Sequence, residues 1–273
     1  AEELAKGSVR SFWVPGQDRQ PALEAWVGQP FYFPIDGGTI QGEAKDGANC
    51  FNLNSLVRTE EGSGLIANPD TIAEFIRLLT HLDVIETEAT GIATAAADWI
   101  DGDNIAGFSG AEDDYYGALE TPYRTAGGAM VEPSEIKWVR GVTGDLYTRI
   151  RPYICTRPTI APSVLNLNTL RDWQVPLMAA LLGEDVDVSD AVELLEERPV
   201  SGFLEASEIA ALQPIIDLDL QDGLVERLGI RSAYIDLNVQ VRYKDVFLDM
   251  ISSLQIGETG DITTLSRRYG SVE

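Results

Sequence analysis

The chain has 273 residues, and its hydrophobic content of 44% is ordinary for a globular protein with one large domain or two smaller ones. Its 44 acidic and 20 basic residues give a net charge of −24. A surface this negative repels phosphate backbones and anionic lipid headgroups, so the composition argues against nucleic-acid binding and against docking on an anionic membrane.

The beginning of the chain does not resemble a targeting segment. Ala1-Glu-Glu-Leu-Ala-Lys lacks the basic start and the apolar centre of a signal peptide. No stretch approaches the ~20 consecutive apolar residues that span a bilayer. Because the first ten residues have the character of the end of a helix, we expect a further N-terminal segment to precede them.

Two cysteines, Cys50 and Cys155, are far apart and fit neither a CxxC motif nor a zinc site. In an oxidising compartment they could form a disulfide, which would stabilise the fold by at most ~4.7 kcal/mol in the chain-entropy model. Two buried free thiols explain the same sequence equally well.

The first part of the chain predicts a hairpin and then a helix. A Phe-Tyr-Phe-Pro-Ile run over 31–35, the turn Asp36-Gly-Gly and a second β-prone run indicate two antiparallel strands. Pro34 makes the first strand either an edge strand or a bulged one. From Asn68 the period becomes helical, with Pro69 in the first turn and an apolar face through residue 82. The only histidine, His81, ends this helix and is better explained by the helix dipole than by catalysis.

Further helices are predicted through the middle of the chain. The longest, over 164–182, would have Thr169 as its N-cap, a kink or restart at Pro176 and an end at Gly183. The other predicted helices span 93–100, 134–139, 145–154, 189–198, 205–213 and 222–228.

After residue 234 the apolar residues recur at every second position, as in a β-strand. Apolar residues alternate with polar ones from Ile235 to Tyr243, a turn at Lys244-Asp245 follows, and two more strands are expected over 246–251 and 261–268. The chain is therefore β-rich at both ends and helical for about 170 residues between them. The simplest interpretation is an α+β protein in which residues 1–60 and 232–273 form one domain and residues 61–231 form an inserted all-α domain.

An acidic stretch over 98–114 lies within the helical region. Six carboxylates fall in 17 positions, more than twice the number that the chain average predicts, and they are interleaved with aromatic and apolar residues. This mixture indicates a packed loop whose carboxylates converge on a cation, and Ca²⁺ suits hard oxygen ligands and tight glycine turns. The spacing is not that of an EF-hand, because Ile105 and Ala106 stand where the pattern needs an acidic residue and a glycine. A surface loop of an acidic protein remains the alternative.

Several motifs, in the same order, resemble the K-class minor pseudopilins of bacterial type II secretion systems. The resemblance covers nearly the whole chain. It departs from the family at Thr125-Ala-Gly-Gly, where members usually carry Asn and then Pro-Leu. The matching segments are Cys50-Phe-Asn-Leu-Asn, Asp98-Trp-Ile-Asp-Gly-Asp, Gly110-Ala-Glu-Asp, Tyr116, Pro122-Tyr-Arg, Ser134-Glu-Ile, Val139-Arg-Gly, Leu165-Asn-Leu-Asn-Thr, Ser232, Tyr234 and Arg267-Arg-Tyr-Gly.

The resemblance implies a pseudopilin fold, in which an N-terminal helix packs on an antiparallel sheet, with a large helical insertion. It implies the soluble periplasmic part of a protein whose N-terminal helix anchors it in the inner membrane. It also implies structural calcium at the acidic loop and assembly with I-class and J-class minor pseudopilins at the tip of a pseudopilus. The expected ligands are Asp98, Asp101, Asp103, Glu112 and Asp113. Asp98 could instead cap a helix, and Asp114 is expected to face solvent.

Other functions remain as alternatives. Two carboxylates of the acidic loop could serve a secreted glycosidase-like hydrolase, although no nucleophile or oxyanion motif accompanies them. Trp13 and Trp26 could belong to a sugar-binding module, but their apolar neighbours favour a place in the core. The Leu165-Asn-Leu-Asn-Thr segment also resembles the start of a helix-hairpin-helix DNA-binding module. Acidic residues at 184–185 stand where such a module would bind phosphate, so we expect the scaffold without the activity.

Overall fold

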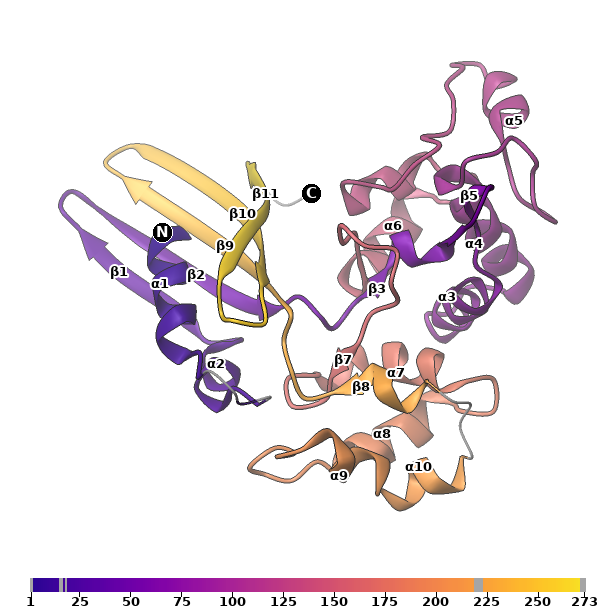
Figure 1. Cartoon of the computed structure of the whole chain (residues 1–273). Helices are drawn as coiled ribbons and strands as arrows, with labels where there is room; N and C mark the ends of the chain where they lie inside the picture. The colour runs from indigo at the N-terminus through magenta and orange to yellow at the C-terminus, as the bar shows by residue number, and fades with distance from the viewer. Residues whose placement is uncertain (1, 15–16, 18, 219–222, 271–273) are drawn as a thin grey trace.

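The two ends of the chain meet in one antiparallel sheet. The computed structural model describes residues 2–14, 17, 19–218 and 223–270. Five strands lie in the order β1-β2-β9-β10-β11, so that a strand from the start of the chain pairs with one from its end (Figure 1). Their bounds are β1 Pro30–Ile35, β2 Gly38–Asp46, β9 Tyr234–Tyr243, β10 Val246–Ile256 and β11 Ile262–Tyr269.

One face of this sheet is covered by the first two helices. Ile235, Leu237 and Val239 alternate along β9 and are buried, as the period of two predicts. They pack in one core with residues of α1 (Glu2–Phe12) and α2 (Pro21–Trp26). A helix packed on an antiparallel sheet confirms the expected α+β class.

Glu2 fixes the start of α1 on the sheet. Its carboxylate accepts hydrogen bonds from Arg267 Nε at 2.5 Å and Nη2 at 2.7 Å, and also from Thr264 and Ser252. The Arg267 guanidinium holds the pKa of this buried carboxyl well below its usual range.

The segment between β2 and β9 forms a helical part with a separate core (Figure 1). Its α-helices are α3 Pro69–His81, α4 Glu86–Ile100, α5 Asp113–Gly117, α6 Gly144–Ile150, α7 Val175–Leu182, α8 Val188–Glu196, α9 Ala206–Ala210 and α10 Gln213–Asp217. Short 3-10 helices are η1 Leu53–Leu56, η2 Pro133–Trp138, η3 Arg151–Tyr153, η4 Asp172–Gln174 and η5 Val225–Arg227. Short strand pairs are β3 Phe51–Asn52 with β6 Ile154–Cys155, β4 Val57–Glu60 with β5 Gly64–Ala67, and β7 Leu165–Asn166 with β8 Leu228–Gly229.

The chain passes from one core to the other between Ala44 and Phe51, and it returns between Ile230 and Ile235. The return agrees with a boundary at residue 231, whereas the outward crossing lies earlier than residue 60. The proposed division into 1–60 with 232–273 and 61–231 stays a prediction.

Buried asparagines explain the alternation of Asn with apolar residues after Cys50. Asn54 donates from Nδ2 to the carbonyls of Met130 and Arg157, both at 2.9 Å, and accepts from Met130 N at 2.7 Å. Asn52 accepts from Arg157 N. These bonds satisfy backbone groups of two distant loops, so the amides take the place that a strand partner would otherwise fill. In the same region Cys50 and Cys155 form a disulfide with Cα atoms 5.8 Å apart.

The predicted helix over 164–182 is wrong in its first half. Leu165–Asn166 is a strand, and Thr169 is not an N-cap; its hydroxyl donates instead to Asp46 Oδ2 at 2.5 Å. The helix begins at Val175 with Pro176 in its first turn, as the proline predicted, and Gly183 ends it with a φ of 129°. The helix expected over 205–213 ends early, as α9 at Ala210, and α10 begins at Gln213. The helix expected over 222–228 is wrong: residue 222 lies outside the described residues, and the rest forms only the 3-10 helix η5 before β8.

Trp13 and Trp26 are partly buried against the core beneath the sheet. Trp26 stacks on Phe31 and contacts Phe12, so the structure uses it for packing. Among the described helices, none is long and apolar enough to cross a membrane.

Candidate metal centre

The acidic loop begins where α4 ends. Asp98 lies in the last turn of α4, and Asp101 is the residue at which the chain leaves the helix. The loop folds back so that Gly107 N donates to Asp98 at 3.1 Å and Ala111 N donates to Asp98 Oδ2 at 2.8 Å. Asp98 thus holds the return segment of the loop against the helix that precedes it.

Glycines allow this close approach. A Cβ atom on Gly110 would lie 1.9 Å from Asp98 Oδ2, and one on Gly107 would lie 2.5 Å from the methyl group of Thr94. A side chain at either position would therefore force the loop or the facing side chain to move. Gly107 and Gly110 therefore allow the loop to pack closely on Asp98 and Thr94.

Three carboxylates converge below this loop. Asp98, Asp101 and Glu112 each place one oxygen within 4.8 Å of the others, and all three side chains are at most 4% exposed. Within the described part of the chain, Asp101 Oδ1 and both oxygens of Glu112 are buried without a well-formed hydrogen bond. Buried carboxylate oxygens without donors are costly, and so many in one place indicate a missing positive partner.

The pKa values of these carboxyl groups also show that their charged forms are disfavoured. Burial, together with the charges of Asp103 and Asp98, raises the pKa of Asp101 to about 7. Burial, together with the charges of Asp101 and Asp98, raises the pKa of Glu112 to about 7. Burial also raises the pKa of Asp98, although the N–H groups of Gly107 and Ala111 oppose the shift. A cation between these groups would favour their charged forms.

The donor set suits a hard cation. All three groups offer carboxylate oxygens, which Ca²⁺ prefers, whereas zinc sites are usually built on cysteine or histidine. The only histidine, His81, lies at the end of α3 and is not one of the three. Both cysteines are joined in the disulfide.

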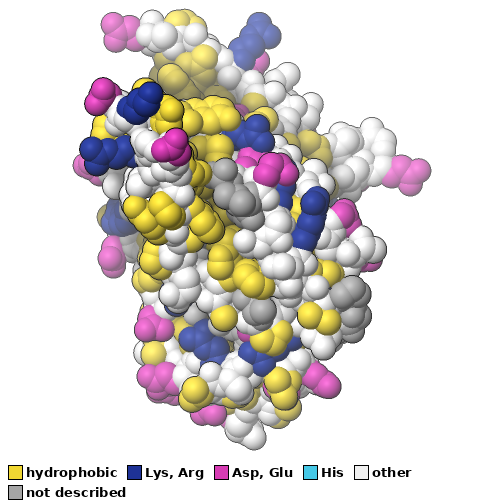
Figure 2. All heavy atoms as spheres, turned by 90° about the vertical axis from the view of Figure 1, so that its left-hand side faces the viewer, with side chains coloured by type: hydrophobic (Ala, Val, Ile, Leu, Met, Phe, Trp, Pro, Cys, Tyr) yellow, Lys and Arg dark blue, Asp and Glu magenta, His cyan; other side chains and the backbone are white. Residues whose placement is uncertain are grey.

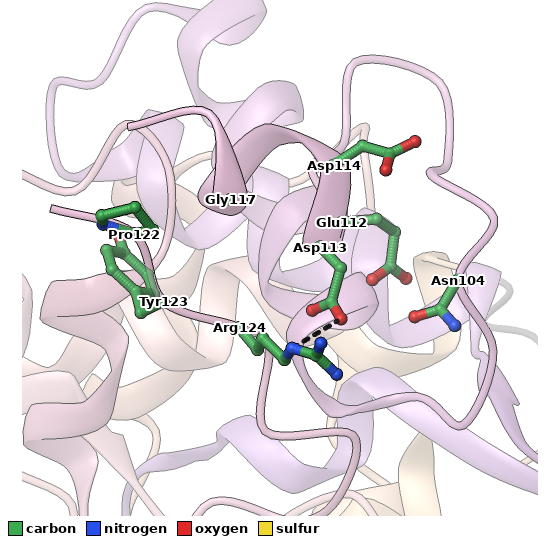
Figure 3. Close-up of a pocket in the computed structure, with 8 residues that line it drawn as sticks. All are labelled: Asn104, Glu112, Asp113, Asp114, Gly117, Pro122, Tyr123 and Arg124. Carbon is green, nitrogen blue, oxygen red and sulfur yellow. Dashed lines mark ion pairs between the residues drawn. The ribbon is translucent and has the colours of Figure 1, made fainter. Parts of the chain in front are cut away.

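Two of the five predicted ligands lie outside this cluster. Asp103 is exposed and accepts from Ile105 N at 2.7 Å. Asp113 Oδ1 accepts from Thr125 N at 3.0 Å and from its hydroxyl at 3.2 Å, and Asp113 Oδ2 is 3.9 Å from Arg124. Asp114 is exposed, as expected, and points away from Asp113 and Arg124 (Figure 3).

A pocket of about 550 Å³ opens beside Glu112 and Asp113. Figure 3 shows Asn104 on its far side with the amide directed toward Glu112. Asn104 is not among the ligands expected from the sequence, although it directly follows Asp103 in the acidic run. An amide oxygen is an acceptable calcium ligand, so the signal was present in the residue type.

Comparison with known proteins identifies the family. Residues 49–159 and 165–231 match two family models, both described as type II secretion system (T2SS), protein K. The chain belongs to the type II secretion system protein K family. This confirms the family predicted from the sequence motifs.

Relatives agree over most of the chain. A type II secretion system protein K of Pectobacterium carotovorum is 34% identical over 94% of this chain and 77% of the relative. One of Aeromonas hydrophila is 34% identical over 91% of this chain and 76% of the relative. The structure resembles a chain in the crystal structure of the GspK-GspI-GspJ complex of enterotoxigenic Escherichia coli, with a TM-score of 0.82, 25% identity and coverage of 99% and 93% of the two chains.

Membership of this family makes the protein a minor pseudopilin, a structural component of a secretion system and not an enzyme. The hydrolase alternative is therefore wrong. The carboxylates that cluster in the acidic loop, Asp101 and Glu112 among them, are also almost fully buried, which leaves little access for a sugar ring.

Proposed function

We propose that this protein caps the tip of a pseudopilus in complex with I-class and J-class minor pseudopilins and so supports protein export across the outer membrane. Support comes from the likeness of the whole chain, sheet and helical part together, to a chain solved in a GspK-GspI-GspJ complex. The helical part adds bulk beside the sheet (Figure 1), and we expect this bulk to keep a further subunit from stacking above it.

An apolar surface on the sheet suits such partners. The buried rows of the sheet continue past α1 to the ends of the two hairpins, where Phe33, Tyr243, Val246 and Leu248 are 40–62% exposed. Figure 2 views the molecule from the side of the sheet and shows apolar side chains gathered there between charged ones. We call these four residues the tip face. Contiguous exposed apolar side chains in a soluble protein commonly mark a protein interface.

The assembly is tested by mixing this protein with the periplasmic domains of the I-class and J-class partners from the same organism. Size-exclusion chromatography with light scattering should show one ternary species. Leu248→Glu should weaken this species, because it places a charge on the tip face. Val200→Glu is the matched control, because Val200 is fully exposed in the helical part. Separate elution of the wild-type proteins would contradict the proposal.

Calcium is the second part of the proposal. The buried oxygens of Asp98, Asp101 and Glu112 fit a divalent cation, and these three residues would hold it. Asp103 and Asp113, also expected from the sequence, lie outside the cluster, each with its Oδ1 accepting from a backbone N–H, of Ile105 and Thr125 respectively, and they would join the site only if the loop moved them closer. The bound ion would offset the buried negative charge. Asp101 follows the end of α4 and Glu112 precedes the start of α5, so these two residues would hold the two helix ends together at the ion.

We also place the protein in the periplasm, held to the inner membrane by an N-terminal hydrophobic helix of the full-length protein. The disulfide between Cys50 and Cys155 supports this, because such bonds persist in oxidising compartments. Fractionation of cells that express the full-length protein tests it, and recovery in the cytosol would contradict it.

A further inference from the structure

A cleft of about 650 Å³ lies between the sheet and the helical part, away from the acidic loop. One wall is the sheet face that α1 does not cover, including Lys45, Asn238 and Ile251. The other wall is formed by residues 129–133, 151–158 and 169–174. The volume is in the range of sites that enclose a ligand.

Two ion pairs join the walls. Arg157 Nη2 lies 3.1 Å from Asp236 Oδ2 deep in the cleft, and Arg157 also donates to Ser253 Oγ at 2.7 Å. Nearer the rim, Arg268 Nη1 lies 2.6 Å from Glu132 Oε2. These contacts hold the two parts of the protein at a fixed separation, so the shape of the cleft is largely formed in advance.

The charge of the cleft is opposite to that of the protein. Five of the 20 basic residues line it, in a chain with a net charge of −24. Arg157 and Arg268 are used in the ion pairs above. The remaining three, Lys45, Arg151 and Arg171, form no salt bridge with any described residue. Of the four acidic residues in the lining, Asp236 and Glu132 are neutralised by these pairs, and Asp46 accepts from Ser232 and Thr169. Two carboxylates, Glu43 and Asp46, are left to face three cations, so the lining as a whole carries one more basic than acidic residue.

Apolar side chains and an open strand edge complete the cleft. Val131 and Trp173 line it and are 76% and 51% exposed. Leu265, Ser266 and Arg268 of β11 also line it, and β11 is an edge strand with no further described strand beside it. An open edge accepts an extended peptide by main-chain hydrogen bonds.

We infer that this cleft binds an extended, acidic segment of a partner protein, whose carboxylates meet Lys45, Arg151 and Arg171 and whose apolar side chains contact Val131 and Trp173. Charge complementarity selects the acidic peptide, and the apolar walls and the edge of β11 distinguish it from a free inorganic anion. The inference goes beyond capping of the pseudopilus and depends neither on calcium nor on the tip face.

The test uses a fluorescein-labelled ten-residue peptide of alternating Asp and Val, which favours an extended conformation. Anisotropy titration should show saturable binding to the wild-type protein, and an unlabelled Lys-Val counterpart should not compete for the site. Arg151→Glu/Arg171→Glu should weaken binding by roughly tenfold or more, because each substitution turns an attraction into a repulsion. Arg58→Glu/Arg149→Glu changes the net charge equally at exposed sites outside the cleft and should leave binding nearly unchanged.

A photo-crosslinking version of the peptide locates the site, with crosslinks expected on residues 129–133 or β11. If both double variants weakened binding equally, the peptide would be attracted by the overall charge of the protein and not by the cleft, and the inference would be overturned. Absence of binding by the wild-type protein, or full displacement by inorganic phosphate at constant ionic strength, would also overturn it.

Discussion

Ala111 N donates a hydrogen bond of 2.8 Å to Oδ2 of Asp98, which lies thirteen positions earlier in the chain. This bond places the following residue, Glu112, beside Asp101, so that a helix end and a returning loop bring three carboxylates together. The acidic cluster therefore depends on the hydrogen bonds that hold the loop against α4. The effect of these loop contacts and the effect of the buried charges can be tested by separate substitutions.

The packing of the loop on Asp98 is tested by Gly110→Ala. The added methyl group would lie 1.9 Å from Asp98 Oδ2, so the loop must move away from the helix. We expect a loss of about 1–3 kcal/mol in the free energy of unfolding and weaker calcium binding. Gly117→Ala is the control, because a Cβ at Gly117 meets no atom within 4 Å. Equal urea midpoints for the two variants would contradict the claim that the packing of Gly110 on Asp98 stabilises the loop.

The charges are tested by Asp101→Asn/Glu112→Gln, whose effect should change sign with calcium. Without metal, the amides remove buried like charges, and we expect a stabilisation of roughly 1 kcal/mol. With calcium in excess, the variant loses two ligands and should be less stable than the wild type. Asp114→Asn, at an exposed position, should change neither value. The measurement is the midpoint of urea unfolding with EDTA and with CaCl₂.

The stability of the metal-free protein should depend on pH through the same groups. The pKa values of Asp101 and Glu112 are raised to about 7 from 3.8 and 4.5, so the folded protein holds their protons more tightly than the unfolded chain does. Their contribution to stability is therefore full below pH ~4 and is lost as the pH rises through about 7. In EDTA, the urea midpoint should fall between pH 5 and pH 8, and the fall should be smaller in Asp101→Asn/Glu112→Gln. An equal fall in both proteins would place its origin elsewhere.

The disulfide should stabilise the protein whether or not calcium is bound. Cys50 and Cys155 are 105 positions apart, so the bond closes a long loop in the unfolded chain. Replacing both by Ala should cost about 2–4 kcal/mol. Reduction of the wild-type protein should give a similar loss in urea unfolding. An unchanged midpoint after reduction would contradict this role.

The periodic parts of the fold could be predicted from the sequence. The alternation along β9 and the apolar face of α3, which starts with a proline, each satisfy one simple pattern, and both elements form where predicted. The segment before Val175 could not, because Thr169 and Asn166 are held by Asp46 and Ser232, partners that lie far away in the chain. Long-range hydrogen bonds of this kind override local helix signals.

The acidic loop shows the same limit. Residue type predicted that carboxylates would gather on a cation. It did not predict which ones, because Asp103 and Asp113 are as close in sequence as the clustered residues but bond to Ile105 and Thr125. The path of the loop sets this difference, and that path depends on Gly107 and Gly110 packing against Asp98.

Native mass spectrometry after dialysis against calcium at neutral pH tests the metal centre most directly. The wild-type protein and Asp114→Asn should retain calcium, Asp101→Asn/Glu112→Gln should lose it, and EDTA should lower the melting temperature of the first two only. At a calcium concentration one hundred times the dissociation constant, bound metal contributes about 2.7 kcal/mol, a shift of several degrees. A wild-type protein that carries no calcium and melts at the same temperature in EDTA would contradict the account.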